Sequence, residues 1–419
     1  MHELFDVRRK YVAAVAKRED FEIVAAVREF VDREVMPRRL DLEGGWHHDE
    51  ELAKRTIERV HKGLVDLGVQ RAFFPEEIGG LGIKSFVTQL MVQEELARGD
   101  AGLATRLGCL WGCLSLAAMA GRMDLLEIFG RKACDDRPHT ACWAVTEPEG
   151  GANIEDPTQH GRALRTIAVL DGDEYVINGT KIWPGSAGEA DTVYLTLCTT
   201  DPARGEEGIA YIYVPPDASG LSFGKPIQKM GMCYTDVNAE IFYENVRVPK
   251  EYRLAGPGKD AEILHSNIAA ARLPSAATAV GVAEACLETV LAWTRERKIV
   301  GKPVRNYSLF ASIIGEMALK IETARACYMQ VAWMAEHPEI YGPIGSPAMH
   351  ARCSIAKAYA ADAAVWVTNK AMELMGSYGY AYEHCLEKYL RDVKIIQLWE
   401  GGQQRALLDI ALGYYPFEW

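Results

Sequence analysis

The chain has 419 residues, of which 49% are hydrophobic and 25% charged, the balance of a globular protein with room for two or three domains. Its 46 basic and 58 acidic residues give a formal net charge of −12. Nucleic acids and anionic lipid surfaces would repel such a chain, so neither is expected as a partner.

The cysteines and the N-terminus bear on the compartment in which the chain works. Ten cysteines are spread irregularly, mostly among apolar residues as in Ala141-Cys142-Trp143, where free cysteine behaves as a small hydrophobic side chain. The first residues contain no cationic segment followed by an apolar run, and the longest apolar stretch, 109–120, is too short to cross a bilayer. We therefore expect a cytoplasmic protein without membrane insertion.

Residues 1–139 are expected to form a helical domain. Apolar residues recur at spacings of three and four from Ile23 to Val35, which predicts a helix that ends at Met36-Pro37. Further helices are predicted over 51–67, 86–97 and 101–120. Asp100 is the expected N-cap of the last one.

The first 19 residues have no clear place in this pattern. Several basic residues between Arg8 and Arg18 indicate a surface helix more than a partner site. The segment is expected to be a helical extension or a mobile tail.

Residues 140–255 predict a β-domain. Six short segments rich in β-branched or aromatic residues replace the helical period, namely 141–146, 164–170, 174–178, 192–198, 209–214 and 238–244. Turn sequences such as Asp171-Gly172-Asp173 and Asn178-Gly179 bound them. Without intervening helices, these strands predict an antiparallel sandwich or barrel.

Residues 256–419 return to a helical period. One apolar stripe runs from Leu309 to Tyr328, and an alanine-rich helix is predicted over 351–375. The fold class is therefore α+β, mainly α, in the order helix, sheet, helix.

Several motifs occur in a fixed order along the chain. They are Ala144-Val145-Thr146-Glu147-Pro148 with Gly150-Gly151, Ile177 to Trp183, Lys229-Met230-Gly231, Phe242 to Pro249, Glu296-Arg297-Lys298 with Gly301-Lys302, and Arg391-Asp392 leading to Trp399-Glu400-Gly401. Together they resemble the acyl-CoA dehydrogenase family, flavoenzymes that introduce a double bond between the α and β carbons of an acyl thioester. The resemblance covers about 20–414.

The resemblance implies a fold and partners. It implies an N-terminal helical domain, a middle antiparallel β-domain and a C-terminal four-helix bundle, with FAD between the β-domain and the bundle. It also implies a homotetramer, because a neighbouring subunit completes the flavin site. An acyl-CoA substrate and an electron-transfer flavoprotein as oxidant are expected.

Glu400 is the candidate catalytic residue. It lies between Leu398-Trp399 and Gly401-Gly402, and a carboxylate in apolar surroundings has a raised pKa and can act as a base near neutrality. On spacing alone, a glutamate at a helix N-terminus, attracted to the positive end of the dipole, remains an alternative. The resemblance implies that Glu400 removes the α-proton of the thioester.

The resemblance also assigns binding residues. The expected flavin contacts are Trp143, Val145, Thr146, Trp183, Ser186, Arg297, Gly376 and Gln404, with Arg297 reaching the pyrophosphate of a neighbouring subunit's flavin. The expected substrate contacts are Arg106, Ala152, Arg272 and Gly401. A planar heterocycle suits a glycine-rich turn beside a strand, and a guanidinium suits phosphate. For Trp183 a core aromatic remains the alternative.

The chain departs from the family pattern at several contacts. Gly185 replaces the threonine whose hydroxyl meets the flavin, with Ser186 as a substitute, and Ala152-Asn153 replaces a usual Ser-Asp. Ile299-Val300 and Gly402 replace a Thr-Phe pair and a threonine. We therefore expect unusual flavin affinity or redox tuning, and a short, branched, cyclic or carboxylated acyl group in preference to a long straight one.

Arg106 bears on the acyl group. It lies in an otherwise apolar helix, about one turn after the position, near Gly102, where glutaryl-CoA dehydrogenases hold a distal carboxylate. Our hypothesis is that Arg106 binds a second carboxylate or another polar group on the acyl chain. The alternatives are an arginine that reaches solvent or pairs with Glu94, Glu95 or the CoA phosphates.

Other chemistries find less support. Cys109 and Cys113 share a helix face but have no partner at metal-site spacing, and no Gly-x-Gly-x-x-Gly follows a strand, so neither a metal nor a Rossmann site is expected. Three alternatives stay open: an acyl-CoA oxidase, another flavoenzyme of the superfamily, or a non-catalytic paralogue. Monooxygenases and desulfinases of this superfamily generally lack the glutamate base.

Overall fold

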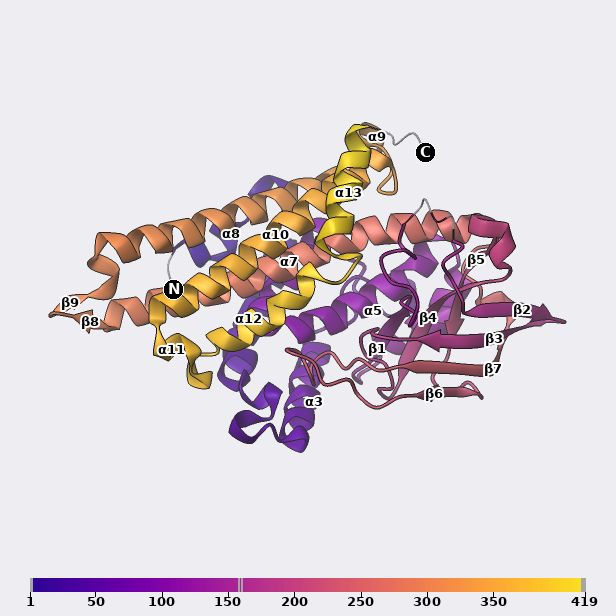
Figure 1. Cartoon of the computed structure of the whole chain (residues 1–419), viewed down its shortest axis with the longest axis horizontal. Coiled ribbons are helices and arrows are strands. Elements are labelled where there is room, and N and C mark those ends of the chain that lie inside the picture. The colour runs from indigo at the N-terminus through magenta and orange to yellow at the C-terminus, as the bar shows by residue number, and fades with distance from the viewer. Residues whose placement is uncertain (1–2, 157–158, 160, 416–419) are drawn as a thin grey trace.

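The computed structural model describes residues 3–156, 159 and 161–415. The chain runs through a helical part, a sheet and a second helical part in that order, as Figure 1 shows from indigo to yellow. The sheet lies at one end of an elongated molecule, and the long helices of the second helical part extend away from it. The predicted helix–sheet–helix order is confirmed.

The first helical part contains six α-helices. They are α1 Val7–Lys10, α2 Arg18–Phe30, α3 Glu50–Asp66, α4 Phe86–Gly99, α5 Ala101–Met119 and α6 Met123–Leu125. Beyond α2 the chain continues in a π-turn and a 3-10 turn as far as Arg38, so the helical path outlasts Pro37 by one residue. The Asp100 carboxylate accepts the Leu103 N–H at 3.0 Å and caps α5 as predicted.

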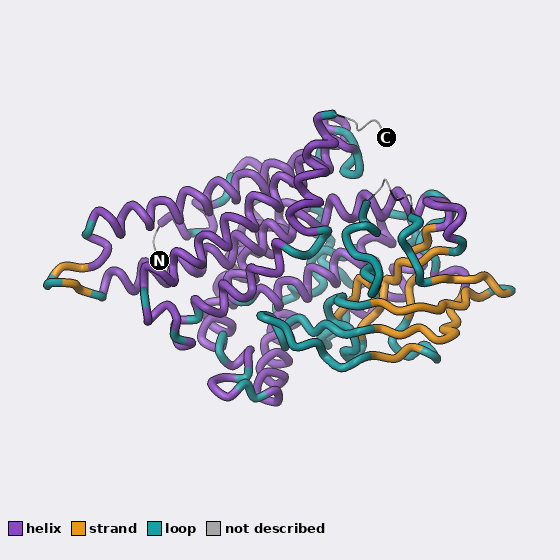
Figure 2. Tube along the Cα trace, viewed as in Figure 1, coloured by secondary structure: helices purple, strands orange, loops and turns teal. Residues whose placement is uncertain are grey.

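A seven-stranded sheet follows. Its strands are β1 Thr140–Ala144, β2 Ile167–Asp171, β3 Glu174–Lys181, β4 Thr192–Thr199, β5 Ile209–Val214, β6 Leu221–Phe223 and β7 Ile241–Pro249. The order is β1-β4-β2-β3-β7-β6, with β5 paired to β4. Figure 2 shows these strands in orange at one end of the molecule. Strand β6 lies outside the six predicted segments.

The sheet is mixed, which corrects the expectation of a wholly antiparallel domain. Strand β1 pairs with β4 in parallel from Thr140–Thr192 to Ala144–Thr196, and β2 meets β4 in parallel at one position. The other pairs are antiparallel. Strands β4 and β5 are buried along their whole lengths, which is why β5 reads as a continuous apolar run.

The second helical part is built on α7 Lys259–Glu296, a helix of 38 residues. The remaining elements are β8 Lys298–Ile299, β9 Lys302–Pro303, α8 Ser308–Ala335, α9 Pro338–Tyr341, α10 Pro347–Met375, α11 Ser377–Tyr380, α12 Leu386–Lys394 and α13 Gly402–Tyr414. Helix α10 packs against α7, α8 and α13, and α4 packs against α7, so the first helical part and the bundle share one hydrophobic core.

Helices α5 and α7 are long and apolar enough, by length and composition alone, to cross a membrane, although both contain charged residues. Both are largely buried inside the protein, as core helices are.

The N-terminal segment is an anchor rather than a surface helix or tail. The ammonium of Lys10 in α1 is 1% exposed and lies 3.1 Å from Glu94, 2.6 Å from Glu95 and 2.9 Å from Glu284. Burial opposes its charge, but these carboxylates outweigh that effect and raise the pKa of Lys10. Of the two expected forms, the segment is therefore a helical extension and not a mobile tail, and Lys10 is buried where a surface helix was expected.

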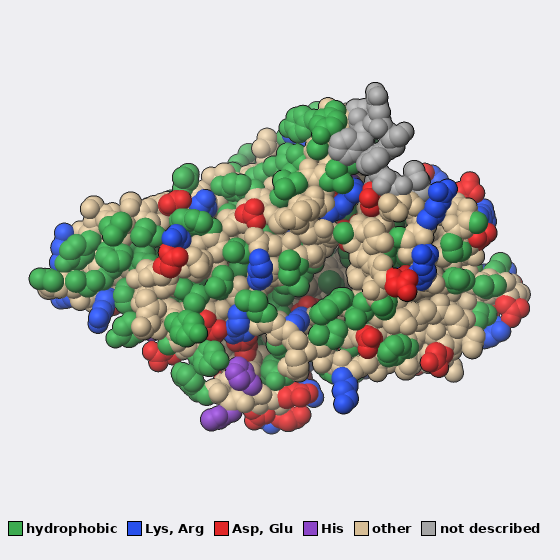
Figure 3. Space-filling model, in the orientation of Figure 1, with side chains coloured by type: hydrophobic (Ala, Val, Ile, Leu, Met, Phe, Trp, Pro, Cys, Tyr) green, Lys and Arg blue, Asp and Glu red, His purple; other side chains and the backbone are tan. Residues whose placement is uncertain are grey.

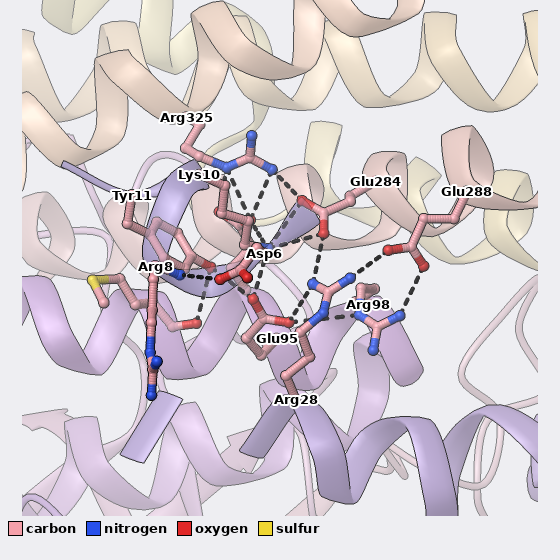
Figure 4. A network of polar contacts seen from close by, with 12 residues as sticks. Asp6, Arg8, Lys10, Tyr11, Arg28, Glu95, Arg98, Glu284, Glu288 and Arg325 are labelled. Carbon is pink, nitrogen blue, oxygen red and sulfur yellow. Dashed lines mark hydrogen bonds and ion pairs between the residues drawn. The ribbon is translucent and has the colours of Figure 1, made fainter. Parts of the chain in front are cut away.

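A buried network of charges surrounds this contact (Figure 4). It includes Arg28 of α2, Arg98 of α4, Glu288 of α7 and Arg325 of α8. Cations and carboxylates alternate across four helices, so each charge has an opposite neighbour. The network joins the first helical part to the bundle.

Candidate active site

A cavity of about 340 Å³ lies where the three parts of the chain meet. Helices α4 and α5 contribute Gln93, Cys109 and Trp111, and α7 contributes Ala270, Pro274 and Ser275. Residues of β1 and the loops of the β-domain form another wall, and Trp399-Glu400 closes the site from the side of α13. Most of the lining is apolar, with a few polar groups, which is typical of a small-molecule site.

Glu400 projects its carboxylate into this cavity. Its Oε1 accepts a 2.7 Å hydrogen bond from the hydroxyl of Ser275, and its buried Oε2 has no hydrogen-bond partner. Burial raises the pKa of Glu400 to about 7, against the opposing effects of Lys357, Ser275 and Arg272. A carboxylate with this pKa and one free oxygen is suited to general base chemistry near neutrality.

A tight turn aims Glu400 at the cavity. Glu400, Gly401 and Gly402 have φ values of 53°, 77° and 74°, all in the left-handed region. Glycine adopts this conformation without strain, whereas a residue with a side chain does not. The backbone strain of this turn therefore falls on Glu400. A Cβ at position 401 would lie 2.6 Å from the Arg405 side chain and 2.9 Å from Oε2 of Glu155, which excludes larger residues there.

Two buried cations lie behind the base. The Lys357 ammonium donates to the Trp399 carbonyl at 3.1 Å, and the Arg272 guanidinium lies 2.6 Å from Asp409. Neither residue lines the cavity. The structure therefore does not support Arg272 as a substrate contact. The Arg272 guanidinium forms an ion pair with Asp409 of α13, and its charge lowers the pKa of Glu400.

Several predicted flavin contacts line one wall together. Trp143, Val145, Thr146 and Trp183 all face the cavity, with Trp183 still 51% exposed. The Lys181 ammonium donates 2.8 Å hydrogen bonds to the Val145 carbonyl and to Glu147, and so fixes this turn. The result is a flat, mostly apolar wall next to backbone groups, a surface that suits a planar heterocycle.

The same wall accounts for the departure at Gly185. A Cβ on Gly185 would lie 2.3 Å from Oδ1 of Asp236, so the carboxylate of Asp236 takes the space of the missing side chain. That oxygen and the hydroxyl of Ser186 are both buried without a hydrogen-bond partner. They can serve the N–H and carbonyl groups of a bound flavin, although Ser186 itself does not line the cavity.

Two predicted cofactor residues lie far from this wall. Arg297 follows the last residue of α7, roughly 33 Å along the helix from Ser275. Its guanidinium lies 5.5 Å from the Tyr378 ring, next to the turn at Gly376. Within a single chain, Arg297 and the wall that contains Trp183 are therefore too far apart to contact the same end of one flavin.

Other predicted residues lie outside the cavity. Ala152 and Gln404 are exposed, and Gly401 borders Glu400 without being part of the lining. The structure does not bring Ala152 or Gln404 into contact with the site.

Arg106 is also outside the cavity, contrary to the hypothesis. Its guanidinium makes a two-pronged ion pair with Glu189, at 2.7 Å and 2.6 Å, and donates to the Thr235 carbonyl at 3.3 Å. The Glu94 and Glu95 alternative is wrong as well, because both carboxylates belong to the Lys10 network. Arg106 is a structural residue that joins α5 to the β-domain.

Sequence reasoning missed Glu155. It lies in the loop after β1, lines the cavity with 8% of its surface exposed, and its Oε2 has no hydrogen-bond partner. Burial and the charge of Glu400 raise the pKa of Glu155 to about 8, against Arg272 and Lys357. No motif marked this position; its distance of a few residues from Gly150-Gly151 was the only available signal.

Among the described residues, no group of three or more His, Cys, Asp or Glu side chains could hold a metal ion. Cys109 and Cys113 both line the cavity, and burial raises the pKa of each thiol. Their thiols are therefore neutral and contribute to an apolar wall.

Comparison with known proteins agrees with this architecture. Models of the N-terminal, middle and C-terminal domains of acyl-CoA dehydrogenases match residues 17–122, 142–246 and 261–414. The chain is 30% identical over 380 residues to the short-chain-specific acyl-CoA dehydrogenase of Megasphaera elsdenii, covering 86% of this chain and 93% of that protein. It is 28% identical over 389 residues to the glutaryl-CoA dehydrogenase of Desulfococcus multivorans, covering 92% and 94%.

A solved chain from work on the electron transferring flavoprotein of Acidaminococcus fermentans has a similar structure. The TM-score is 0.84 at 27% identity, with 96% of this chain and 99% of that chain covered.

Proposed function

The chain belongs to the acyl-CoA dehydrogenase family of oxidoreductases that act on CH–CH bonds, and we propose that Glu400 is its catalytic base. The observation that carries the proposal is the position of Glu400 in the shared cavity, with one oxygen held by Ser275 and the other free. The proposed reaction is removal of the α-proton of an acyl-CoA thioester together with loss of a hydride from its β-carbon, which leaves an α,β double bond.

Different residues of this chain have different roles in the proposed reaction. Ser275 orients the carboxylate, Oε2 of Glu400 takes the proton, and the raised pKa of Glu400 makes that transfer favourable near neutral pH. The apolar lining from Trp111, Cys113 and Trp399 keeps water away from the reacting carbon.

FAD is the proposed cofactor. Trp143, Val145, Thr146 and Trp183 would hold its ring, and Asp236 offers a buried acceptor to its N–H groups. When bound, FAD supplies the acceptor for the hydride that leaves the β-carbon.

A homotetramer is proposed because one chain alone offers no cation for the flavin pyrophosphate at this cavity. The lining contains no Lys, Arg or His among the described residues. Arg297, at the far end of α7, would supply that charge to a neighbouring subunit. Hydrophobic side chains gather over this end of the molecule (left in Figure 3), including Val300 at 96% exposed, Leu309 at 67% and Tyr380 at 79%. Such a patch favours subunit contact.

Two further proposals concern partners and location. An electron-transfer flavoprotein is the proposed oxidant, a proposal supported by the similar chain solved in work on such a protein. All ten cysteines are free, which supports a reducing compartment such as the cytoplasm.

The proposed substrates are short, branched or cyclic acyl-CoA thioesters. The enclosed volume of about 340 Å³ is shared between substrate and flavin, which disfavours long straight chains. With Arg106 paired to Glu189, nothing on the lining supports a carboxylated acyl group.

Anaerobic bleaching of the bound flavin by a panel of acyl-CoA thioesters tests the proposal. We expect the Glu400→Gln variant to retain its yellow colour and to bleach at least about a thousandfold more slowly than the wild type. The control is Glu149→Gln, which removes an exposed carboxylate, 79% accessible, from the turn after β1. Bleaching of Glu400→Gln at the wild-type rate would disprove the assignment of the base.

A further inference from the structure

The polar groups left open in the cavity are mostly hydrogen-bond acceptors. Among the described lining residues, the buried side-chain atoms without a partner are oxygens of Gln93, Glu155, Asp236 and Glu400, with the indole N–H of Trp399 as the one donor. Buried polar groups are normally satisfied, so these oxygens indicate what a bound ligand must bring. Asp236 faces the proposed flavin wall, and Glu400 has its role as base.

Glu155 has no role in the reaction so far. It belongs to the loop after β1, and its Oε2 lies against the Gly401 backbone, next to the turn that carries the base. Arg272 and Lys357 act on its charge, yet neither forms a hydrogen bond or ion pair with it, because they bond instead to Asp409 and to the Trp399 carbonyl. A buried carboxyl group that lines the cavity and has one oxygen without a partner is suited to accept a hydrogen bond from a ligand.

A backbone feature adds a second acceptor. Pro274 lies inside α7 and has no N–H, so the carbonyl of Ala270 lacks its usual donor one turn later. Ala270 and Pro274 both line the cavity. This opening of the helix, from Ala270 to Pro274, lies within five residues of Ser275, which holds the base.

The charge of the lining points the same way. Three carboxyl side chains face the cavity, from Glu155, Asp236 and Glu400, and no cationic side chain among the described residues does. A second carboxylate on the acyl chain would meet three carboxyl groups and no cation on this lining, which costs affinity.

We propose that this cavity selects acyl thioesters whose acyl group carries a basic amine, with Glu155 as the acceptor of that amine, and rejects acyl groups with a second carboxylate. The inference rests on the proposed acyl-CoA dehydrogenase function and deepens it. Glu155 is then a specificity-determining residue: as a carboxylate it pairs with the ammonium group, and as a neutral acid it tolerates an uncharged acyl group. A charge-assisted hydrogen bond of this kind is worth about tenfold or more in affinity.

Three ligands with the same three-methylene spacer test the inference: pentanoyl-, 4-aminobutanoyl- and glutaryl-CoA, which end in methyl, ammonium and carboxylate groups. Their thioether analogues, which lack the thioester carbonyl, are titrated into the FAD-loaded protein. We expect 4-aminobutanoyl to bind about tenfold more tightly than pentanoyl, and glutaryl about tenfold more weakly. In Glu155→Gln the advantage of the amine is lost, whereas binding of pentanoyl changes less than about threefold. Glu149→Gln, from the same region, serves as the control and keeps the wild-type order.

Glutaryl binding as tight as pentanoyl, or an amine advantage that survives in Glu155→Gln, would overturn the inference. If Glu155→Gln does not fold, the order of the three ligands on the wild-type protein decides alone. Failure of the proposed function is distinguishable, because it leaves the thioether order intact while none of the three thioesters bleaches the flavin.

Discussion

The hydroxyl of Ser275 in α7 donates a 2.7 Å hydrogen bond to Oε1 of Glu400, although 125 residues separate the two in the chain. This bond connects the longest helix of the bundle to the turn before α13. It leaves Oε2 of Glu400 as the free oxygen, so the same contact positions the base and adjusts its pKa.

Substitution Ser275→Ala should move the pH dependence of the reaction. The lost hydrogen bond stabilised the ionised carboxylate, so the pKa of Glu400 rises above its value of about 7, by about one unit. The acidic limb of kcat/KM then shifts to higher pH, with a loss of about fivefold at pH 7 and near wild-type rates at pH 9. Lys357, Arg272 and Glu155, the charged groups around Glu400, are unchanged in both proteins. Rapid-mixing flavin bleaching from pH 5.5 to 9.5 measures the shift, with exposed Ser312→Ala as control; an unmoved limb would contradict it.

Glu155 should lower the stability of the ligand-free protein as the pH rises. Its carboxyl has a pKa of about 8 in the folded chain and 4.5 when unfolded, so between these values the folded state binds more protons. Stability is thus lost as the pH rises from 4.5 through 8. Glu155→Gln should match the wild type near pH 5 and melt roughly 1–4 °C higher at pH 8. Thermal melts at both pH values check this; an equal difference at the two would exclude the explanation.

Arg106 should behave as a structural residue. Removing one member of its buried pair with Glu189 leaves the other uncompensated, so Arg106→Met should destabilise by about 2 kcal/mol, and the double variant Arg106→Met/Glu189→Met should recover part of that loss. Denaturation of the wild type, Arg106→Met, Glu189→Met and the double variant gives the coupling energy between the two residues. Bleaching rates with glutaryl-CoA and pentanoyl-CoA should change by the same factor in Arg106→Met, and a selective loss with glutaryl-CoA would restore the carboxylate hypothesis.

Lys10 should be more important to stability than any other basic residue of its short helix. The Lys10→Met substitution removes a cation that Glu94, Glu95 and Glu284 share in a buried setting. The free energy of unfolding should therefore fall by about 3 kcal/mol. Arg9→Met, one residue away and 57% exposed, should change stability by less than about 0.5 kcal/mol. Parallel thermal melts compare the two, and equal effects would mean that the network is not an anchor.

The sequence predicted what local pattern and motif encode. Helix periodicity located the helices from Glu50 to Met119, and the Asp100 cap followed from its side chain alone. Glu400 was a candidate because bulky apolar residues and two glycines surround it, and its role as the base followed from the resemblance of the motifs. These features need no knowledge of distant partners.

What the sequence could not supply depends on partners far apart in the chain. The pairing of Arg106 with Glu189 spans 83 residues and that of Lys10 with Glu284 spans 274, and no spacing rule connects such positions. The parallel pairing of β1 with β4 is likewise a matter of three-dimensional register. Glu155 was missed because its loop has no period, and only the enclosed shape of the site gives it meaning.

Helix α7 runs for 38 residues, roughly 57 Å, with Pro274 inside it. It carries Ser275 beside the base, Glu284 inside the charge network, and Arg297 just past its last turn. A structural change at any of these residues acts on the same helix. Damage to the N-terminal anchor should therefore speed amide exchange around Ser275, many turns away, and in the proposed oligomer it should also weaken FAD binding through Arg297.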